Sequence, residues 1–270
     1  MSTNLMIMGR AVILASLLLI DPLRCFAVTI DLGLILNYTA NNPYIDRSGN
    51  SNNLSNLTSG ISLTSNQRGE TNGAIRFSSD SDFVTSTSNI GITGNDVYSY
   101  SFWIKFNNPI NEENRNVLSF GGNFQSTNGN AASFVINNMA IASWGGWADV
   151  GVSNSDILWD NWNHFAFIYD GSLNTSKFFL NGNNLGNIWL GSGNLTSTHS
   201  LDDSVLTLGF ISNAFTGVGG SAISDVRLYN RDLSEAEVNE IYIIEAPEPS
   251  ALSLLFVGLG VVLRRRRRTV

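Results

Sequence analysis

The chain has 270 residues, with 22 acidic residues, 15 basic residues and a single cysteine. Seven of the basic residues lie within the first 27 positions or in the final arginine run, so residues 28–248 carry 8 basic against 21 acidic residues, a formal charge of −13. Such a body repels phosphate backbones, which excludes nucleic acid as a partner. It suits cations or a neutral polymer, although an acidic surface can also serve solubility alone. The single Cys25 excludes a disulfide framework and a cysteine-based zinc site.

Residues 1–27 have the pattern of a secretory signal peptide. Arg10 precedes a ten-residue apolar run at positions 11–20, and Cys25-Phe-Ala27 places small residues at −3 and −1 of a cleavage point. The run is too short to span a bilayer. Asp21 and Arg24 leave the exact cleavage position open. The pattern predicts an exported protein.

Residues 28–38 are expected to form the first strand, and a loop rich in Asn, Ser and Gly follows. Within this loop, Asp46-Arg-Ser-Gly-Asn-Ser-Asn-Asn53 allows two interpretations. Asn and Asp side chains cap their own turns. An oxygen-rich turn can equally bind a metal ion, with Asp46 as a ligand.

Residues 73–110 alternate apolar and polar positions, as strands do. Phe102, Ile104 and Phe106 are expected to share one face, with Trp103 and Lys105 on the other. The stretches 73–77 and 82–84 are expected to form a strand pair, whose solvated end carries the acids at positions 80 and 82.

A tryptophan pair interrupts the following strands. Trp144-Gly-Gly-Trp147 can form a stacking platform for a sugar ring, or its indoles can fill the core of the fold. Trp159 and Trp189 allow the same two interpretations.

The stretch from Trp162 to Gly182 predicts a β-hairpin. Two aromatic runs flank a polar segment with turn-forming residues. Both faces of the first run are largely apolar, which predicts a central strand. His164 lies within it and is expected to be a hydrogen-bonded core histidine.

The body ends with a strand at residues 223–229 and a short helix. Ser234 and Glu237 form a capping box, and Leu233 and Val238 form a hydrophobic staple. The apolar stripe of this helix should pack over one end of the fold.

Four of these stretches, at residues 73–84, 100–106, 162–182 and 223–234, resemble in order the laminin-G-like/concanavalin A-like jelly-roll domains. The resemblance covers about residues 30–244 and implies an all-β, two-sheet antiparallel sandwich over residues 28–245, with one short C-terminal helix. It also implies a structural calcium ion near the closing strand, with Asp225 matching the ligand position and Asp46 as a weaker ligand. The alternative is that Asp225 pairs with Arg227 or faces solvent.

Residues 246–270 form a separate segment. Pro247, Glu248 and Pro249 precede an apolar run at residues 250–263, which Arg264, Arg265, Arg266, Arg267 and Arg268 follow. An apolar run can enter a membrane, and arginines hold its end on the cytoplasmic side. The run would span about 21 Å as a helix, short of a hydrocarbon core of about 30 Å. The segment resembles the PEP-CTERM sorting tail of bacteria that export exopolysaccharide-associated proteins, which implies recognition by an exosortase-like membrane protease.

Motifs of catalysis are missing from the sequence. Glycoside hydrolases of this fold use two carboxylates across one bond, and the Glu-x-Asp-x-x-Glu strand of that clan does not occur here. We therefore predict an exported, non-catalytic module of the bacterial cell surface or extracellular matrix that binds a polysaccharide or glycoconjugate. The alternatives are a structural matrix protein without a glycan site and a hydrolase on the same fold.

Overall fold

The computed structural model describes residues 30–39, 41–107, 114–122, 131–136, 139–143, 150–153, 157–170, 175–186, 188–189, 200–211 and 215–247. Contacts between Cα atoms divide the chain into two units, Met1–Leu32 and Gly33–Val270. Only residues 30–32 of the first unit are described, so the architecture below is that of the second.

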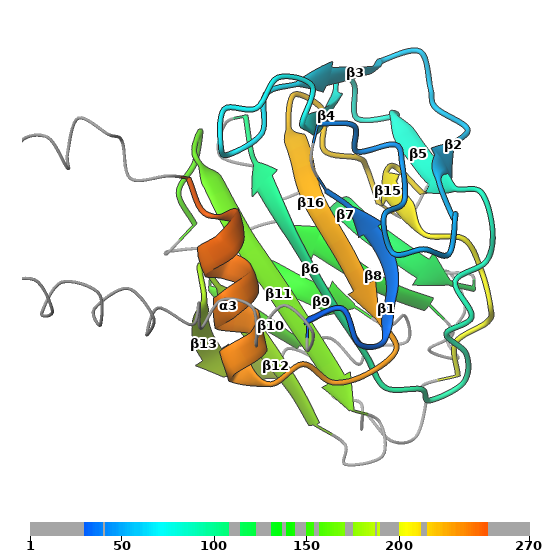
Figure 1. Cartoon of the computed structure of the whole chain (residues 1–270), viewed down its shortest axis with the longest axis vertical. Helices are drawn as coiled ribbons and strands as arrows, with labels where there is room; N and C mark the ends of the chain where they lie inside the picture. The colour runs from blue at the N-terminus through cyan, green and yellow to red at the C-terminus, as the bar shows by residue number, and fades with distance from the viewer. Residues whose placement is uncertain are drawn as a thin grey trace, which may run out of the picture. The chain divides into compact units, whose positions relative to one another are not determined.

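The second unit contains two antiparallel sheets (Figure 1). Sheet A has the order β13 (Asn183–Gly186), β12 (Thr175–Leu180), β11 (Trp162–Asp170), β6 (Tyr98–Lys105), β16 (Ala222–Tyr229), β4 (Ala74–Phe77) and β3 (Ile61–Thr64), and β1 (Leu34–Tyr38) also pairs with β16. Sheet B has the order β14 (Ile188–Trp189), β10 (Val150–Ser153), β9 (Met139–Ser143), β8 (Ala131–Ile136), β7 (Arg115–Gly121), β15 (Thr207–Gly209), β5 (Phe83–Ser86) and β2 (Leu54–Ser55). Within the described ranges, no helix is long and apolar enough to cross a membrane.

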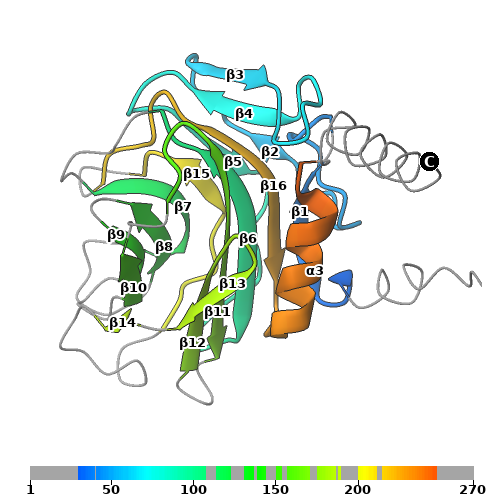
Figure 2. The same cartoon turned by 90° about the vertical axis from the view of Figure 1, so that its left-hand side faces the viewer.

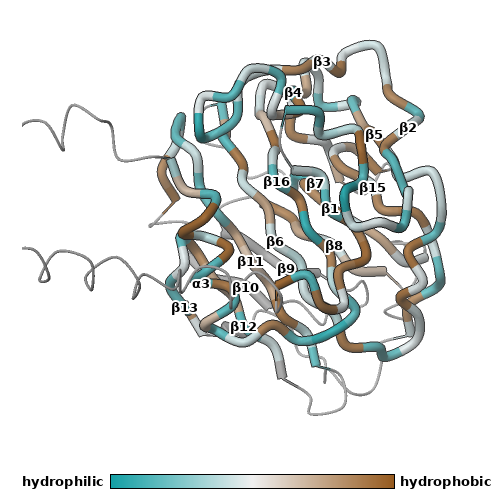
Figure 3. The backbone as a smooth tube through the Cα atoms, viewed as in Figure 1, coloured by the Kyte–Doolittle hydropathy of each residue, from teal (hydrophilic) through white to brown (hydrophobic). Residues whose placement is uncertain are grey.

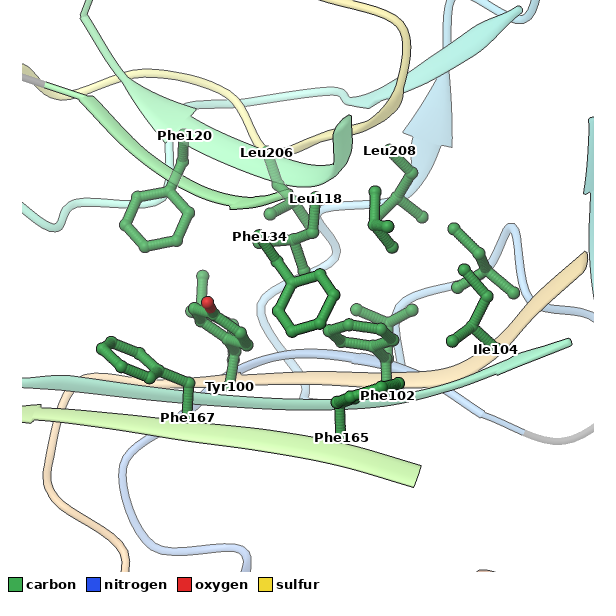
Figure 4. Close-up of a cluster of buried hydrophobic side chains, with 14 of the residues drawn as sticks. Tyr100, Phe102, Ile104, Leu118, Phe120, Phe134, Phe165, Phe167, Leu206 and Leu208 are labelled. Carbon is green, nitrogen blue, oxygen red and sulfur yellow. The ribbon is translucent and has the colours of Figure 1, made fainter. Parts of the chain in front are cut away.

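The core lies between the two sheets and is rich in aromatic rings. Side chains alternate across each strand, so every second residue of β6 and β11 points toward sheet B. Figure 4 shows Phe102 and Phe165 facing Phe134 of sheet B, and the Phe102 and Phe134 ring centres are 4.9 Å apart in an edge-to-face arrangement. This interdigitation confirms the expected two-sheet sandwich.

The predicted hairpin is confirmed as β11 and β12, which pair from Phe165↔Leu180 to Asp170↔Thr175. β11 lies between β12 and β6, so it is a central strand, as its two apolar faces indicate. The expected first strand is confirmed in part, because β1 covers only residues 34–38.

The expected strand pair at 73–84 is wrong, because β4 belongs to sheet A and β5 to sheet B. The connection between them crosses the sandwich rather than forming a hairpin. Asp82 explains the turn, since its Oδ2 accepts hydrogen bonds from the backbone N–H groups of Ser78 at 3.0 Å and Ser79 at 2.7 Å. Asp82 is buried and Asp80 pairs with Arg115, so these acids do not form a simple solvated end.

The capping box is confirmed at the start of α3 (Glu235–Glu245). Ser234 Oγ accepts from the backbone N–H of Glu237 at 3.2 Å, and Glu237 Oε2 accepts from the backbone N–H of Ser234 at 2.8 Å. Figure 3 shows hydrophobic and hydrophilic segments alternating along α3, as expected of a helix with one buried face.

The helix packs on a face of the fold, which corrects the expectation that it covers an end. α3 lies against the outer side of sheet A (Figure 2). There Tyr242 stacks on Trp103 of β6, with 5.6 Å between ring centres. The reason is the polar and aromatic composition of this outer side, which carries Ser99, Ser101 and Trp103 on β6. The helix thereby buries a sheet face that would otherwise be in water.

Candidate functional site

The expected sugar-stacking residues cannot be placed. Trp144 and Trp147 lie outside the described residues, and only the backbone of Trp189 is described. Trp159 is half-buried and packs against Phe106 with 5.5 Å between ring centres, as a core-filling indole does. The platform at Trp144 and Trp147 therefore stays a prediction.

Asp225 lies in a β-bulge of β16 and is fully buried. Its φ of +48° places it in the left-handed region, an unfavourable conformation for a residue with a side chain. Oδ2 accepts from Gln67 Nε2 at 2.5 Å, and Oδ1 accepts from the Arg68 guanidinium at 3.3 Å. The expectation that Asp225 pairs with Arg227 or faces solvent is wrong.

Arg227 pairs instead with Glu245, the last residue of α3, through Nε and Oε1 at 2.7 Å. Glu245 Oε2 accepts from the indole N–H of Trp103 at 3.1 Å, and its backbone carbonyl accepts from Gln67 Nε2 at 2.9 Å. Three separate parts of the fold, β6, β16 and the loop before β4, thus hold the end of the helix.

These residues form one buried polar group, the α3 cluster, made of Gln67, Arg68, Trp103, His164, Asp225, Arg227, Tyr242 and Glu245. Its two arginines and two carboxylates balance in charge. Burial raises the pKa of Glu245 to about 7, although Arg227 opposes this shift. Burial alone would lower the pKa of Arg227, but Glu245 and neighbouring charges hold it above its usual range. The carboxylate and guanidinium therefore stabilise each other where water is excluded.

His164 of β11 lies in the same cluster, between the rings of Trp103 at 5.3 Å and Tyr242 at 5.7 Å. It is fully buried, and neither ring nitrogen has a hydrogen-bond partner among the described residues. The expected hydrogen-bonded histidine is therefore wrong. Burial and the nearby Arg227 lower the pKa of His164 to about 3, so the ring is neutral near pH 7.

Asp46 caps its own loop. Oδ1 accepts from the backbone N–H groups of Asn37 at 3.0 Å and Ser48 at 2.9 Å, and Oδ2 accepts from Ser48 Oγ at 2.8 Å and the backbone N–H of Asn52 at 3.0 Å. This is the self-capping interpretation of the turn.

The carboxylates of both expected calcium ligands, Asp225 and Asp46, accept hydrogen bonds from donors of the protein itself. Calcium requires six to eight oxygen acceptors. Among the residues that the structure describes, no group of three or more His, Cys, Asp or Glu is arranged to hold a metal. The arrangement at Asp225 and Asp46, with hydrogen-bond donors around each carboxylate, does not fit a calcium ion.

The predicted sorting motif begins where the described part of the chain ends. Ala246 caps α3, donating its backbone N–H to Tyr242 O at 2.9 Å, and Pro247 follows with an exposed side chain. Glu248, Pro249 and the arginines at 264–268 lie outside the described residues.

Sequence reasoning missed most of the α3 cluster. Glu245 carried a signal, because it continues the spacing of Val238 and Ile241 and so places an acid on the buried stripe of α3. Gln67 carried none, since its contact with Asp225 joins residues 158 positions apart. The contacts of Glu245 with Arg227, Trp103 and Gln67 hold the end of the helix, which suits a positioning role for α3.

Comparison with known proteins supports this fold. A family model described as the concanavalin A-like lectin/glucanases superfamily matches residues 77–239. The binding domain of botulinum neurotoxin serotype D, solved in complex with N-acetylneuraminic acid, is similar with a TM-score of 0.61 and 15% identity over 82% of this chain and 53% of that one. The binding domain of Paraclostridial Mosquitocidal Protein 1 has a TM-score of 0.59 and 14% identity over 79% of this chain and 52% of that one. The chain thus spans about half the length of these domains, and a comparison with curated proteins gave no match.

Proposed function

Because the chain belongs to the concanavalin A-like lectin/glucanases superfamily, we propose that it is an exported, non-catalytic binding or adhesion module for carbohydrate at a bacterial cell surface or in its matrix. Family membership is the observation that carries the proposal. Support comes from a structural neighbour that was solved with bound N-acetylneuraminic acid. At such low identity this neighbour bears on the fold, and the ligand here is a proposal.

Four buried carboxylates of the described region have structural partners. A glycosidase needs two carboxyl groups free to face one glycosidic bond. Asp46, Asp82, Asp225 and Glu245 are buried and accept hydrogen bonds from protein donors. These four acids are therefore committed to structure rather than poised for acid–base chemistry.

The C-terminal sequence supports the proposed location. We propose that an exosortase-like membrane protease recognises the segment from Pro247 and that residues 250–263 enter the membrane, with the five arginines retained on the cytoplasmic side. The acidic body, with a formal charge of −13, suits a neutral glycan better than a polyanion.

Glycan binding by the purified protein tests the proposal. The full chain in mild detergent would be titrated with a polysaccharide panel, with calcium and then with chelator. Replacing both Trp144 and Trp147 with Ala should lower affinity at least tenfold, because aromatic stacking supplies much of the binding to a sugar ring. Leu158→Ala, at an exposed apolar residue of the described part, is the matched control and should bind normally.

Absence of binding to every polysaccharide, including that of the host matrix, would contradict the carbohydrate proposal. The second candidate, a structural matrix protein, would then be favoured, since Asp225 and Glu245 of the α3 cluster are buried and bound by protein donors. Turnover of any polysaccharide would contradict the non-catalytic assignment.

A further inference from the structure

The last turn of α3 combines a fixed end with an apolar outer surface. Glu245 is 2% exposed and held by three parts of the fold, so the helix end is anchored to sheet A. Beside it, Ile243 is 62% and Ile244 43% exposed. Two adjacent large apolar side chains in one exposed helical turn are a surface that water does not favour.

The tether between this turn and the apolar run of the tail is short. Four residues lie between Glu245 and position 250, where the run begins, and the five Cα–Cα steps of this stretch reach at most about 18 Å when extended. A domain of about 215 residues has a radius of gyration of about 17 Å, so its diameter exceeds this reach. If residues 250–263 lie in a bilayer, the end of α3 stays within about 18 Å of the start of the inserted run, so this part of the domain faces the membrane.

We propose that the last turn of α3 is a membrane-contact surface, with Ile243 and Ile244 resting in the lipid interface while the tail is inserted. This inference rests on the proposed membrane insertion of residues 250–263. An inserted tail keeps the last turn of α3 at a high local concentration near the membrane. Two isoleucines are then enough to hold this contact, although they would not bind a membrane on their own. Because Glu245 anchors the end of α3 to sheet A, this contact fixes the orientation of sheet A relative to the bilayer.

The charge of the domain opposes this contact. A body with a formal charge of −13 is repelled by anionic headgroups, so the contact must be apolar and held by the tether. Salt screens the repulsion over about 8–10 Å at 0.1–0.15 M ionic strength. Added salt should therefore strengthen the contact, which is the opposite of binding by a basic surface.

Depth-dependent fluorescence quenching tests the contact. The full chain, with Cys25→Ser to remove its native cysteine and labelled with a bimane at Ile243→Cys, would be reconstituted into vesicles of phosphatidylethanolamine and phosphatidylglycerol (7:3) that carry a brominated quencher lipid. The matched control carries the same label at Glu235→Cys, an exposed position about 12 Å away along the same helix. We expect at least twofold stronger quenching at 243 than at 235, increasing with salt, and about half that quenching when Ile244→Ser is added.

Flotation of the vesicles separates the two levels of the proposal. A chain that floats but is quenched equally at 243 and 235 would overturn the contact surface and leave the inserted tail intact. A chain that does not float would overturn membrane insertion and the contact together. Quenching at position 243 that decreases with salt would also overturn the apolar contact surface, because it would indicate an electrostatic attraction to the lipid headgroups.

Discussion

His164 is the residue whose replacement tests the buried cluster most directly. Its ring is neutral in the folded protein, with a pKa lowered to about 3, whereas an unfolded histidine titrates near pH 6.5. Between these values the unfolded chain binds more protons than the folded chain, so His164 costs stability as the pH falls below 6.5. By pH 5 this cost reaches about 2 kcal/mol.

Glu245 acts in the opposite direction, because its pKa is raised from 4.5 to about 7. The folded chain binds more protons between these values, so the contribution of Glu245 is fully present below pH 4.5 and is lost as the pH rises through 7. At pH 5 it adds roughly 2–3 kcal/mol relative to pH 8 and above. The wild-type protein should therefore change little in stability between pH 5 and 7.5 from these two groups.

Replacing His164 with Phe removes one side of this balance. The variant loses two unpaired buried nitrogens, whose burial is costly, and keeps a ring between Trp103 and Tyr242. We expect it to be more stable than wild type by about 1 kcal/mol at pH 7.5 and by about 3 kcal/mol at pH 5. Urea unfolding followed by tryptophan fluorescence across this range measures the difference.

The control is Leu158→Ala, at an exposed apolar residue without a titratable group, which should follow the pH dependence of wild type. A difference between His164→Phe and wild type that stays constant from pH 7.5 to pH 5 would refute the reasoning. It would mean that His164 exchanges protons in the folded state as freely as in the unfolded chain.

Three further substitutions probe the same region. Glu245→Gln removes the proton uptake that offsets the effect of His164. The free energy of unfolding of this variant, measured in urea, should therefore fall by about 2 kcal/mol from pH 7.5 to pH 5. A free energy of unfolding that does not change with pH would contradict this. Arg68→Met leaves Asp225 buried without its cation and should lower the Tm by about 6–12 °C. The wild-type protein should have the same Tm in calcium and in chelator. A Tm that calcium raises would instead favour Asp225 as a metal ligand. Gly182→Ala should cost about 1–3 kcal/mol by urea unfolding, because Gly182 has a φ of +78° and a Cβ there would lie 2.8 Å from the ring of Tyr242; unchanged stability would contradict the close packing of this turn on α3.

The parts of the fold that depend on local pattern could be predicted. The hairpin of β11 and β12 follows from the alternation of aromatic residues between Trp162 and Leu180, and the start of α3 follows from the Ser234–Glu237 capping box. The strand pair at 73–84 failed for a physical reason. The polar residues between these strands are compatible with a hairpin, whereas the strands pair with distant partners, β4 with β3 and β16, and β5 with β15 and β2.

The candidate site was less predictable, because it is made of long-range contacts. Asp225 could be recognised as unusual, but its partners Gln67 and Arg68 lie in a loop about 158 positions earlier that carries no pattern of its own. The resemblance to the jelly-roll domains implied a calcium ligand at Asp225. The structure places a guanidinium and an amide there, and both are donors that the sequence cannot locate.

Attaching α3 through buried charged groups requires their desolvation, which indicates that the α3 cluster does more than attach the helix. Burying an ion pair contributes little net stability compared with apolar residues of the same shape, but it specifies position strongly. Of the 11 residues of α3, only Val238 and Ile241 are buried and apolar, so apolar contact alone would hold the helix weakly and allow it to slide. The contacts of Glu245 with Arg227, Trp103 and Gln67 prevent this at the end from which the tail leaves. If the residues after α3 were free in solution, the position of the helix end would have little effect. If they enter a membrane, the fixed helix end determines the orientation of the domain relative to that membrane.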